Sequence, residues 1–156
     1  MGMLLYIIQH AEAKREEEDP RRGLTDRGFD DIERVAVFAE KAGIRVGRIF
    51  HSGKMRALQT AEVLAHHLRP EDGVSQAEGL SPMDDPFIWF KRIMDMDEDV
   101  MLVGHLPHLA RLADLLLYGD TDKGIIDFRM GCMLCLKRFD DGHWAVEWMV
   151  IPEVIR

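Results

Sequence analysis

The stretch that decides the fold is MLLYIIQHAEA, residues 3–13. It opens with six consecutive apolar residues, the pattern of a β-strand that is covered on both faces. The run ends abruptly at Gln9 and His10, and a polar loop over residues 12–23 follows. Ligands of α/β proteins bind at the carboxyl ends of the strands, so His10 occupies a position where functional groups are expected.

The rest of the chain alternates helical and strand patterns. Thr25 is suited to cap a helix that Gly43 would end, and Asp85 followed by Pro86 is a second helix-start signal. We expect further helices over 54–68 and from Pro107, and buried strands over 48–52 and 99–105. The residues expected to face the core from the first helix are Phe29, Ile32, Val35, Ala36, Ala39 and Ala42, and those from the helix after Asp85 are Ile88, Trp89, Ile93 and Met94.

The last part of the chain has a different pattern. CMLCLKRF (132–139) and HWAVEWMVI (143–151) flank Asp141-Gly142, which suits a tight turn between antiparallel strands. No internal repeat or linker interrupts the sequence. We therefore predict one domain over residues 1–156, an α/β fold of three α/β/α layers with a mostly parallel central sheet and a C-terminal β-hairpin.

Composition excludes several classes of function. The chain has 156 residues, 47% of them hydrophobic, and a net charge of −8 from 20 basic and 28 acidic residues. Such an acidic chain repels nucleic-acid backbones, so we expect no nucleic-acid partner. The apolar start over residues 1–8 lacks a basic flank and is too short to cross a membrane, and two cysteines make no disulfide framework. We therefore expect a cytoplasmic protein without a membrane partner.

Three side chains are expected to meet at one edge of the sheet. His10 follows the first strand, His105 follows the strand over 99–105, and Arg56 lies just past the strand over 48–52, at the start of a helix. Two imidazoles, a guanidinium and a helix amino terminus together make a site for a phosphoryl group. Each of these residues taken singly fits a solvated or structural role as well as a functional one. Their spacing alone therefore does not decide whether they form a site.

Four segments resemble the motifs of a known family. They are QHAEA (9–13), RRGLTDRG (21–28), HSGKMRALQTAE (51–62) and VGHLPHL (103–109). Their types and order resemble those of the histidine phosphatase superfamily, and within it the small bacterial phosphohistidine phosphatases of the SixA type. EGLSPMDD (78–85) and the terminal hairpin are also similar, so the resemblance extends over essentially the whole chain. It implies a phosphoglycerate mutase-like fold for a single histidine-phosphatase-like domain.

The resemblance also implies a mechanism. His10 would attack phosphorus and become a phosphohistidine that water hydrolyses, which divides one hard step into two. Arg56 would clamp the phosphoryl oxygens, and His105, if protonated, would add a second positive donor. Ser52 and Glu78 would belong to the phosphate- or substrate-binding set, with Glu78 as the available carboxylic acid. No metal ion or other cofactor is expected.

Gln9 departs from the family pattern, which has an arginine before the nucleophilic histidine. Glutamine keeps N–H donors but lacks the charge and the guanidinium fork. Loss of one preorganised donor lowers rates by ~10²–10³. Arg22 aligns with an arginine of the family's Arg-Pro-Leu-Thr segment and is the best-placed replacement.

Three functions follow from these residues. The first is removal of phosphate from phosphohistidine on a protein, because an imidazole leaving group (pKa ~6.5) needs far less protonation than an alkoxide (close to the ~15.7 of water). The second is a general phosphomonoesterase acting on small phosphorylated substrates. The third is a weakened phosphate- or phosphoprotein-binding module, in which Gln9 has removed turnover.

Overall fold

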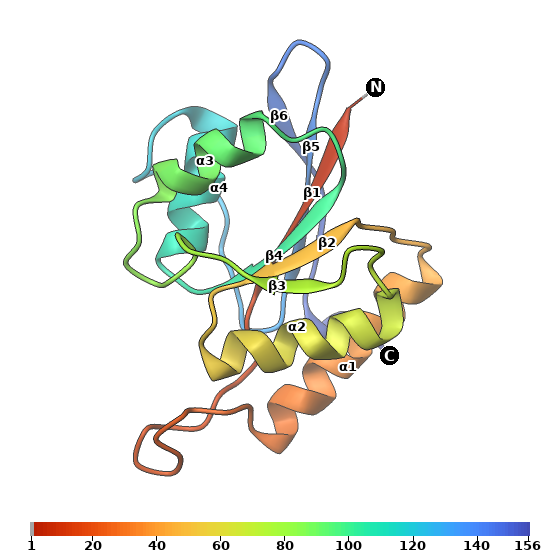
Figure 1. Ribbon diagram of the computed structural model, residues 1–156, viewed down its shortest axis with the longest axis vertical. Helices are drawn as coiled ribbons and strands as arrows, with labels where there is room; N and C mark the ends of the chain where they lie inside the picture. Colours follow the sequence, from red (N-terminus) through yellow and green to blue (C-terminus); the bar gives the residue numbers. More distant parts are fainter. Residues whose placement is uncertain (1) are drawn as a thin grey trace.

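A six-stranded sheet forms the centre of the computed structural model, which describes residues 2–156; Met1, the first residue of the apolar start, lies outside the described residues. The strand order is β3-β2-β4-β1-β5-β6 (Figure 1). The strands are β1 (Met3–Gln9), β2 (Arg48–His51), β3 (Val74–Gln76), β4 (Val100–Gly104), β5 (Met133–Arg138) and β6 (Trp144–Val150). Strands β1 to β4 pair in parallel, whereas β5 runs antiparallel to both β1 and β6. The mostly parallel sheet and the C-terminal hairpin are confirmed.

Helices cover both faces of this sheet. Helices α1 (Asp26–Lys41) and α2 (Met55–Leu68) pack on one face, and α3 (Pro86–Met94) and α4 (His108–Tyr118) pack on the other (Figure 1). A short 3-10 helix, η1 (Pro152–Val154), follows the hairpin. The predicted three-layer α/β/α architecture is therefore confirmed. None of the helices formed by residues 2–156 combines the length and the apolar character needed to cross a membrane.

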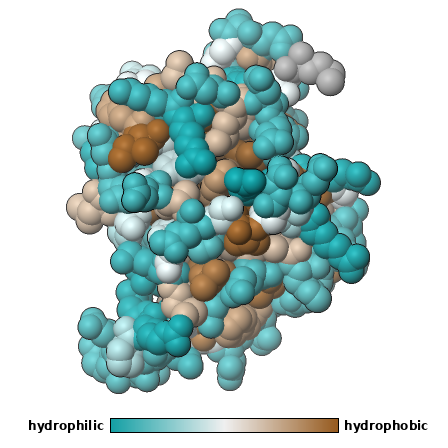
Figure 2. Space-filling model, viewed as in Figure 1, coloured by the Kyte–Doolittle hydropathy of each residue, from teal (hydrophilic) through white to brown (hydrophobic). Residues whose placement is uncertain are grey.

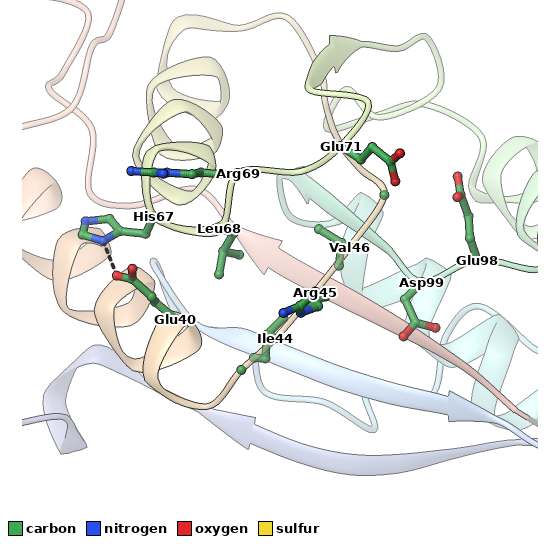
Figure 3. A pocket seen from close by; sticks show the side chains of 12 residues that line it. Glu40, Ile44, Arg45, Val46, His67, Leu68, Arg69, Glu71, Glu98 and Asp99 are labelled. Carbon is green, nitrogen blue, oxygen red and sulfur yellow. Dashed lines mark hydrogen bonds and ion pairs between the residues drawn. The ribbon is translucent and has the colours of Figure 1, made fainter.

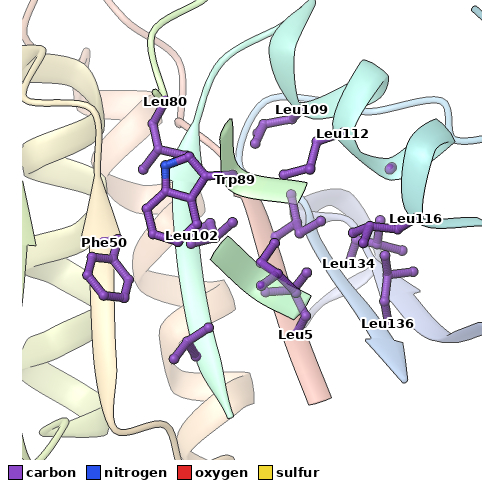
Figure 4. Packing of buried hydrophobic residues seen from close by; sticks show 14 of the residues in the cluster. Leu5, Phe50, Leu80, Trp89, Leu102, Leu109, Leu112, Leu116, Leu134 and Leu136 are labelled. Carbon is purple, nitrogen blue, oxygen red and sulfur yellow. The ribbon is translucent and has the colours of Figure 1, made fainter. Parts of the chain in front are cut away.

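The position of β1 between two cores explains why its sequence is apolar without interruption. Leu5 and Ile7 join the core under α3 and α4, whereas Tyr6 and Ile8 join the core under α1 and α2. A strand in the middle of a three-layer protein buries both of its faces, so its sequence does not alternate between apolar and polar residues. Figure 4 shows the first of these cores, which contains Leu5 of β1, Leu134 and Leu136 of β5 and the leucines of α4.

Two helix caps are confirmed, and parts of two predicted helix faces are wrong. The Thr25 side chain accepts a hydrogen bond from Gly28 N, and Asp85 accepts one from Phe87 N. The predicted core residues that the structure instead leaves exposed are Phe29 and Ala42 of the first helical segment and Ile88 and Met94 of α3. Each helix contacts the sheet along a narrower stripe than its apolar pattern indicated, as on α3, where Trp89 and Ile93 take the buried positions.

Gly28 sets the contact between α1 and the segment that follows β1. A Cβ atom at this position would lie 2.2 Å from the carbonyl oxygen of Glu12. Thr25 N donates to that same oxygen at 3.0 Å. The amino-terminal turn of α1 is therefore seated directly on the backbone two residues after His10, and only glycine leaves room for the approach.

We predict that Gly28→Ala destabilises the protein by about 1–3 kcal/mol, because the added methyl group collides with backbone. In an ordinary helix the same change stabilises by about 0.5–1 kcal/mol. Urea denaturation measures the difference. The control is Asp30→Ala on the exposed side of α1, expected to stay within about ±0.5 kcal/mol. A gain in stability for Gly28→Ala would contradict the close approach.

Candidate functional site

The register between β1 and β4 brings two histidines together. Gln9 lies opposite Gly104 in the parallel pair, and His10 N donates to Gly104 O at 3.0 Å. The chain leaves both strands at the same level, at their carboxyl ends. The imidazole rings of His10 and His105 consequently lie with centroids 5.0 Å apart and planes inclined at 52°.

His10 is held in one tautomer. Its side chain is only 9% exposed, and Nδ1 lies 2.7 Å from the carbonyl oxygen of the adjacent Ala11. A carbonyl can only accept, so Nδ1 carries the proton and Nε2 keeps its lone pair. Burial lowers the pKa of His10 to about 4, and the positive charges of Arg56 and Arg22 act in the same direction. The ring is therefore neutral near pH 7.

His105 is bonded to the turn after β2. Its Nε2 lies 2.6 Å from Ser52 Oγ, which also accepts from the backbone N of Lys54 at 3.3 Å. Burial lowers the pKa of His105 to about 3, with further contributions from His10 and Arg56. The condition attached to His105, that it acts as a positive donor if protonated, is therefore not met near pH 7 without a bound anion. An anion beside the ring would favour its protonated form.

Arg56 presents an unpaired donor. It is the second residue of α2, and its Nε is buried without a hydrogen-bond partner. Burial and the nearby charge of Arg22 lower the pKa of Arg56. Its charge in turn acts on both His10 and His105. A guanidinium that is desolvated and lacks an acceptor is suited to bind an anion.

Two polar residues of α2 hold the loops around the site, and our sequence analysis assigned them no role. Thr60 is fully buried; its Oγ1 accepts from Ala11 N at 3.1 Å and donates to Arg56 O at 2.8 Å. Gln59 Oε1 accepts from Leu24 N at 2.7 Å. A threonine on an otherwise apolar helix face was the available signal, since buried polar groups are nearly always hydrogen-bonded.

Arg22 belongs to a folded loop, and its charge acts on the site. Its φ of 51° is in the left-handed region, and its Nε donates to Lys14 O at 3.1 Å. Asp19 accepts from the backbone N of Gly23 at 2.9 Å, and Ala13 and Leu24 form an antiparallel bridge. The two ends of the loop are thereby closed, with the Arg22 charge acting on both His10 and Arg56.

Gln9 and Glu78 are the two remaining residues that the sequence placed at the site. Gln9 is buried, its Oε1 has no partner, and its side chain lines a pocket of about 410 Å³ beside Phe128 and Arg129. Glu78 is exposed; its carbonyl accepts from the Trp89 indole at 2.9 Å. Within residues 2–156, we find no hydrogen bond or ion pair made by the Glu78 carboxylate. Its role as an acid stays a prediction.

Unpaired buried polar atoms concentrate around this edge of the sheet. Among the described residues they are Gln9 Oε1, Arg56 Nε, His105 Nδ1, both ring nitrogens of His108, and, elsewhere, Arg48 Nε. His108 begins α4 and lies close enough to His105 to lower its pKa. Unsatisfied buried groups are uncommon in folded proteins and call for a partner such as a ligand. This edge is therefore the candidate functional site.

A larger pocket, of about 570 Å³, lies at the opposite edge of the sheet. Arg45 and Asp99 precede strands, and Arg69 follows α2, so the pocket is at the amino ends of the strands (Figure 3). Its histidine, His67, is bonded to Glu40 at 2.9 Å and to Glu33 at 2.7 Å. Those carboxylates raise the pKa of His67. Its histidine is already paired, and its lining mixes acidic and basic side chains, so size alone does not make it the functional site.

Comparisons with known proteins agree with this architecture. No family model matches the chain. An uncharacterized protein of Picosynechococcus sp. is 34% identical, over 83% of this chain and 86% of that one. The structure of the protein histidine phosphatase SixA complexed with tungstate superposes with a TM-score of 0.85 at 22% identity, covering 96% of this chain and 97% of that one.

Two further solved structures of phosphatases share the fold. A SixA protein of Agrobacterium tumefaciens, proposed to be a phosphohistidine phosphatase, gives a TM-score of 0.79 at 22% identity, covering 96% of this chain and 97% of that one. A phosphoserine phosphatase of Entamoeba histolytica gives 0.70 at 15% identity, covering 94% and 96%. The phosphoglycerate mutase-like fold is thereby confirmed. The chain belongs to the same family as the Picosynechococcus protein, and its fold is that of the SixA-type histidine phosphatases.

Proposed function

We propose that the protein is a phosphatase that removes the phosphoryl group from phosphohistidine through a covalent intermediate on His10. The observation that carries the proposal is the state of the His10 ring, which is buried, neutral, and fixed through Nδ1 so that Nε2 is free. Beside it, the buried Nε of Arg56 has no acceptor. A nucleophilic nitrogen next to an unpaired cation is the arrangement that phosphoryl transfer requires.

The first step transfers the phosphoryl group to the protein. The lone pair of His10 Nε2 attacks phosphorus in line, and the P–N bond to the substrate imidazole breaks with its electron pair on the leaving nitrogen. The other ring nitrogen of the substrate carries a proton, so the leaving group departs as a neutral imidazole. Arg56 balances the charge on the phosphoryl oxygens, and Arg22 adds to the positive field. The Ala11 carbonyl, still bonded to Nδ1–H, stabilises the positive charge that develops on the His10 ring.

The second step releases phosphate. Water attacks phosphorus, the bond to Nε2 breaks, and the ring returns to its neutral form while the proton of water leaves to solvent or to a neighbouring base. His105 is neutral in the free protein and is fixed by Ser52, so it is placed to take such a proton. The charge of the bound phosphoryl group would raise the pKa of His105 during the cycle.

Leaving-group chemistry favours a P–N substrate. The described contacts around His10 include imidazoles and a guanidinium but no carboxylic acid, since Glu78 is exposed and its carboxylate makes no hydrogen bond or ion pair with the described residues. An imidazole leaves with a conjugate-acid pKa of ~6.5, whereas an alkoxide needs a strong proton donor. The proposed substrates are consequently phosphohistidine-containing proteins or peptides, with small phosphorylated compounds as the alternative class.

A second function has one observation in its favour. Gln9 is uncharged where the resemblance calls for arginine, so the site has one cation fewer for transition-state charge. In that case the protein would bind phosphoryl groups and turn them over slowly or not at all. The SixA structure contains tungstate, a tetrahedral oxyanion, and the same ion is a direct probe of anion binding here.

We predict that His10 titrates near pH 4 with its proton on Nδ1, measured by ¹⁵N NMR of the imidazoles. Because the folded-state pKa lies below the unfolded value of ~6.5, the unfolded chain binds more protons in between. The stability linked to this neutral ring is therefore complete above pH ~6.5 and is lost as pH falls toward 4. A pKa at or above 6.5, or an Nε2–H tautomer, would contradict the geometry.

We predict that the wild type hydrolyses a phosphohistidine peptide faster than p-nitrophenyl phosphate, and that His10→Ala loses at least ~10³-fold in rate. Rapid quenching should trap a phosphoryl group on His10 that is stable in base and lost in acid. His143→Ala, at the exposed turn of the hairpin, is the matched control and should keep full activity. Persisting activity in His10→Ala would refute the covalent mechanism.

We predict that Gln9→Arg raises the turnover of the phosphohistidine peptide by roughly 10–100-fold, because a cationic fork replaces a neutral amide. Tungstate affinity, measured by calorimetry, should rise in parallel. If the wild type binds tungstate, is inert on both substrates, and stays inert as Gln9→Arg, the site is a binding module.

A further inference from the structure

A patch of exposed apolar side chains adjoins the candidate site. We call it the apolar rim, and it consists of Met83 (78% exposed), Ile88 (51%), Phe87 (45%) and Leu106 (37%). On the face seen in Figure 2, hydrophobic side chains gather over the amino-terminal end of α3 and the loop before it. The surrounding surface is largely hydrophilic, as expected for a chain of net charge −8. Several exposed apolar side chains in one region of a surface are typical of interaction sites.

The apolar rim is continuous with the site. Leu106 directly follows His105, the imidazole that faces His10. The loop before α3 lies against the end of β4, where a Cβ on Gly104 would be 3.4 Å from the carbonyl oxygen of Leu80. The carboxylates of Asp84 and Asp85 act on the His108 ring at the start of α4. The loop before α3 and the residues after β4, which are far apart in the sequence, thus form one surface beside the two histidines.

The backbone under the apolar rim is firmly held. Asp84 accepts from Ser81 N at 2.9 Å, and Asp85 caps α3 by accepting from Phe87 N at 3.0 Å. The buried Trp89 anchors the helix through its bond to Glu78 O. A segment held in this way keeps Met83 and Phe87 exposed, which preorganises the surface for a ligand.

A second segment near the site has different chemistry. The loop over residues 14–22 is highly charged, with Arg15 bonded to Glu18 and Arg22 bonded to the Lys14 carbonyl, and the Arg22 charge acts on His10. A ligand at the site therefore has both a charged loop and an apolar surface nearby. A bare phosphate or a small polar phosphorylated compound would leave the apolar side unused.

We propose that the apolar rim binds an apolar side chain immediately next to the phosphohistidine of a protein or peptide substrate. This inference rests on the proposed function and narrows its substrate class. A second copy of the chain fits less well, because four partly exposed side chains offer a few hundred Å² at most and a stable interface needs roughly 800 Å² per partner. The continuity with His105 also favours an occupant that enters the site itself.

The test compares two phosphohistidine peptides that differ only at the flanking positions, leucine in one and serine in the other, together with phosphoramidate, which has no flanking groups. We expect kcat/KM for the leucine peptide to exceed that for the serine peptide at least about tenfold, as for one or two well-packed apolar contacts. The double variant Met83→Ser/Phe87→Ser should reduce this ratio to about one. Met94→Ser, a change at an exposed residue (58%) at the other end of α3, should preserve it.

Equal kcat/KM values for the two peptides would overturn the inference while leaving the phosphatase intact. Hydrolysis of none of the three compounds would instead refute the proposed function. In that event, the affinities of the same two peptides are measured with a non-hydrolysable phosphonate in place of the phosphoryl group. Tighter binding of the leucine peptide would support the inference, and equal affinities would overturn it. A dimer in sedimentation that Met83→Ser/Phe87→Ser converts to monomer, with an unchanged peptide ratio, would assign the apolar rim to self-association and overturn the proposal.

Discussion

The parallel pairing of β1 with β4 is the constraint on which the candidate site depends. The hydrogen bond from His10 N to Gly104 O ends both strands at one level, so that the residues after them face each other. A shift of that register by one residue would turn one of the two imidazoles to the other side of the sheet. Burial of both faces of β1 specifies the register, because every apolar side chain of the strand has a position in one core or the other.

Burial also determines the chemistry of the histidines. Removal from water lowers the pKa values of His10 and His105 to about 4 and about 3, and two nearby cations reinforce the effect on His10. A nucleophilic imidazole must be neutral, so the same packing that forms the core gives His10 the protonation state that the proposed mechanism requires. Burial has a different effect on Arg56. Its guanidinium stays charged despite desolvation, and its Nε is left unpaired.

The site is supported by contacts that fix the neighbouring segments relative to one another. Thr60 joins the backbone after His10 to α2, and Gly28 lets α1 approach the same segment. Ser52 joins His105 to the turn after β2. These contacts hold β1, β2, β4, α1 and α2 in one arrangement, which is the preorganisation that a charge-stabilising site requires.

The sequence by itself determined the layers of the fold and the helix caps at Thr25 and Asp85, and it predicted His10, Arg56 and His105 as the site. Those features depend on local patterns, in which an apolar run, a capping residue or a motif is complete within a few positions. Only the tertiary structure decided that Ile88 and Met94 are exposed, that His105 is neutral in the free protein, and that Thr60 and Gln59 anchor the loops. Exposure, desolvation and long-range hydrogen bonds depend on which distant segment packs against a residue, and periodicity along the chain has no information about that partner.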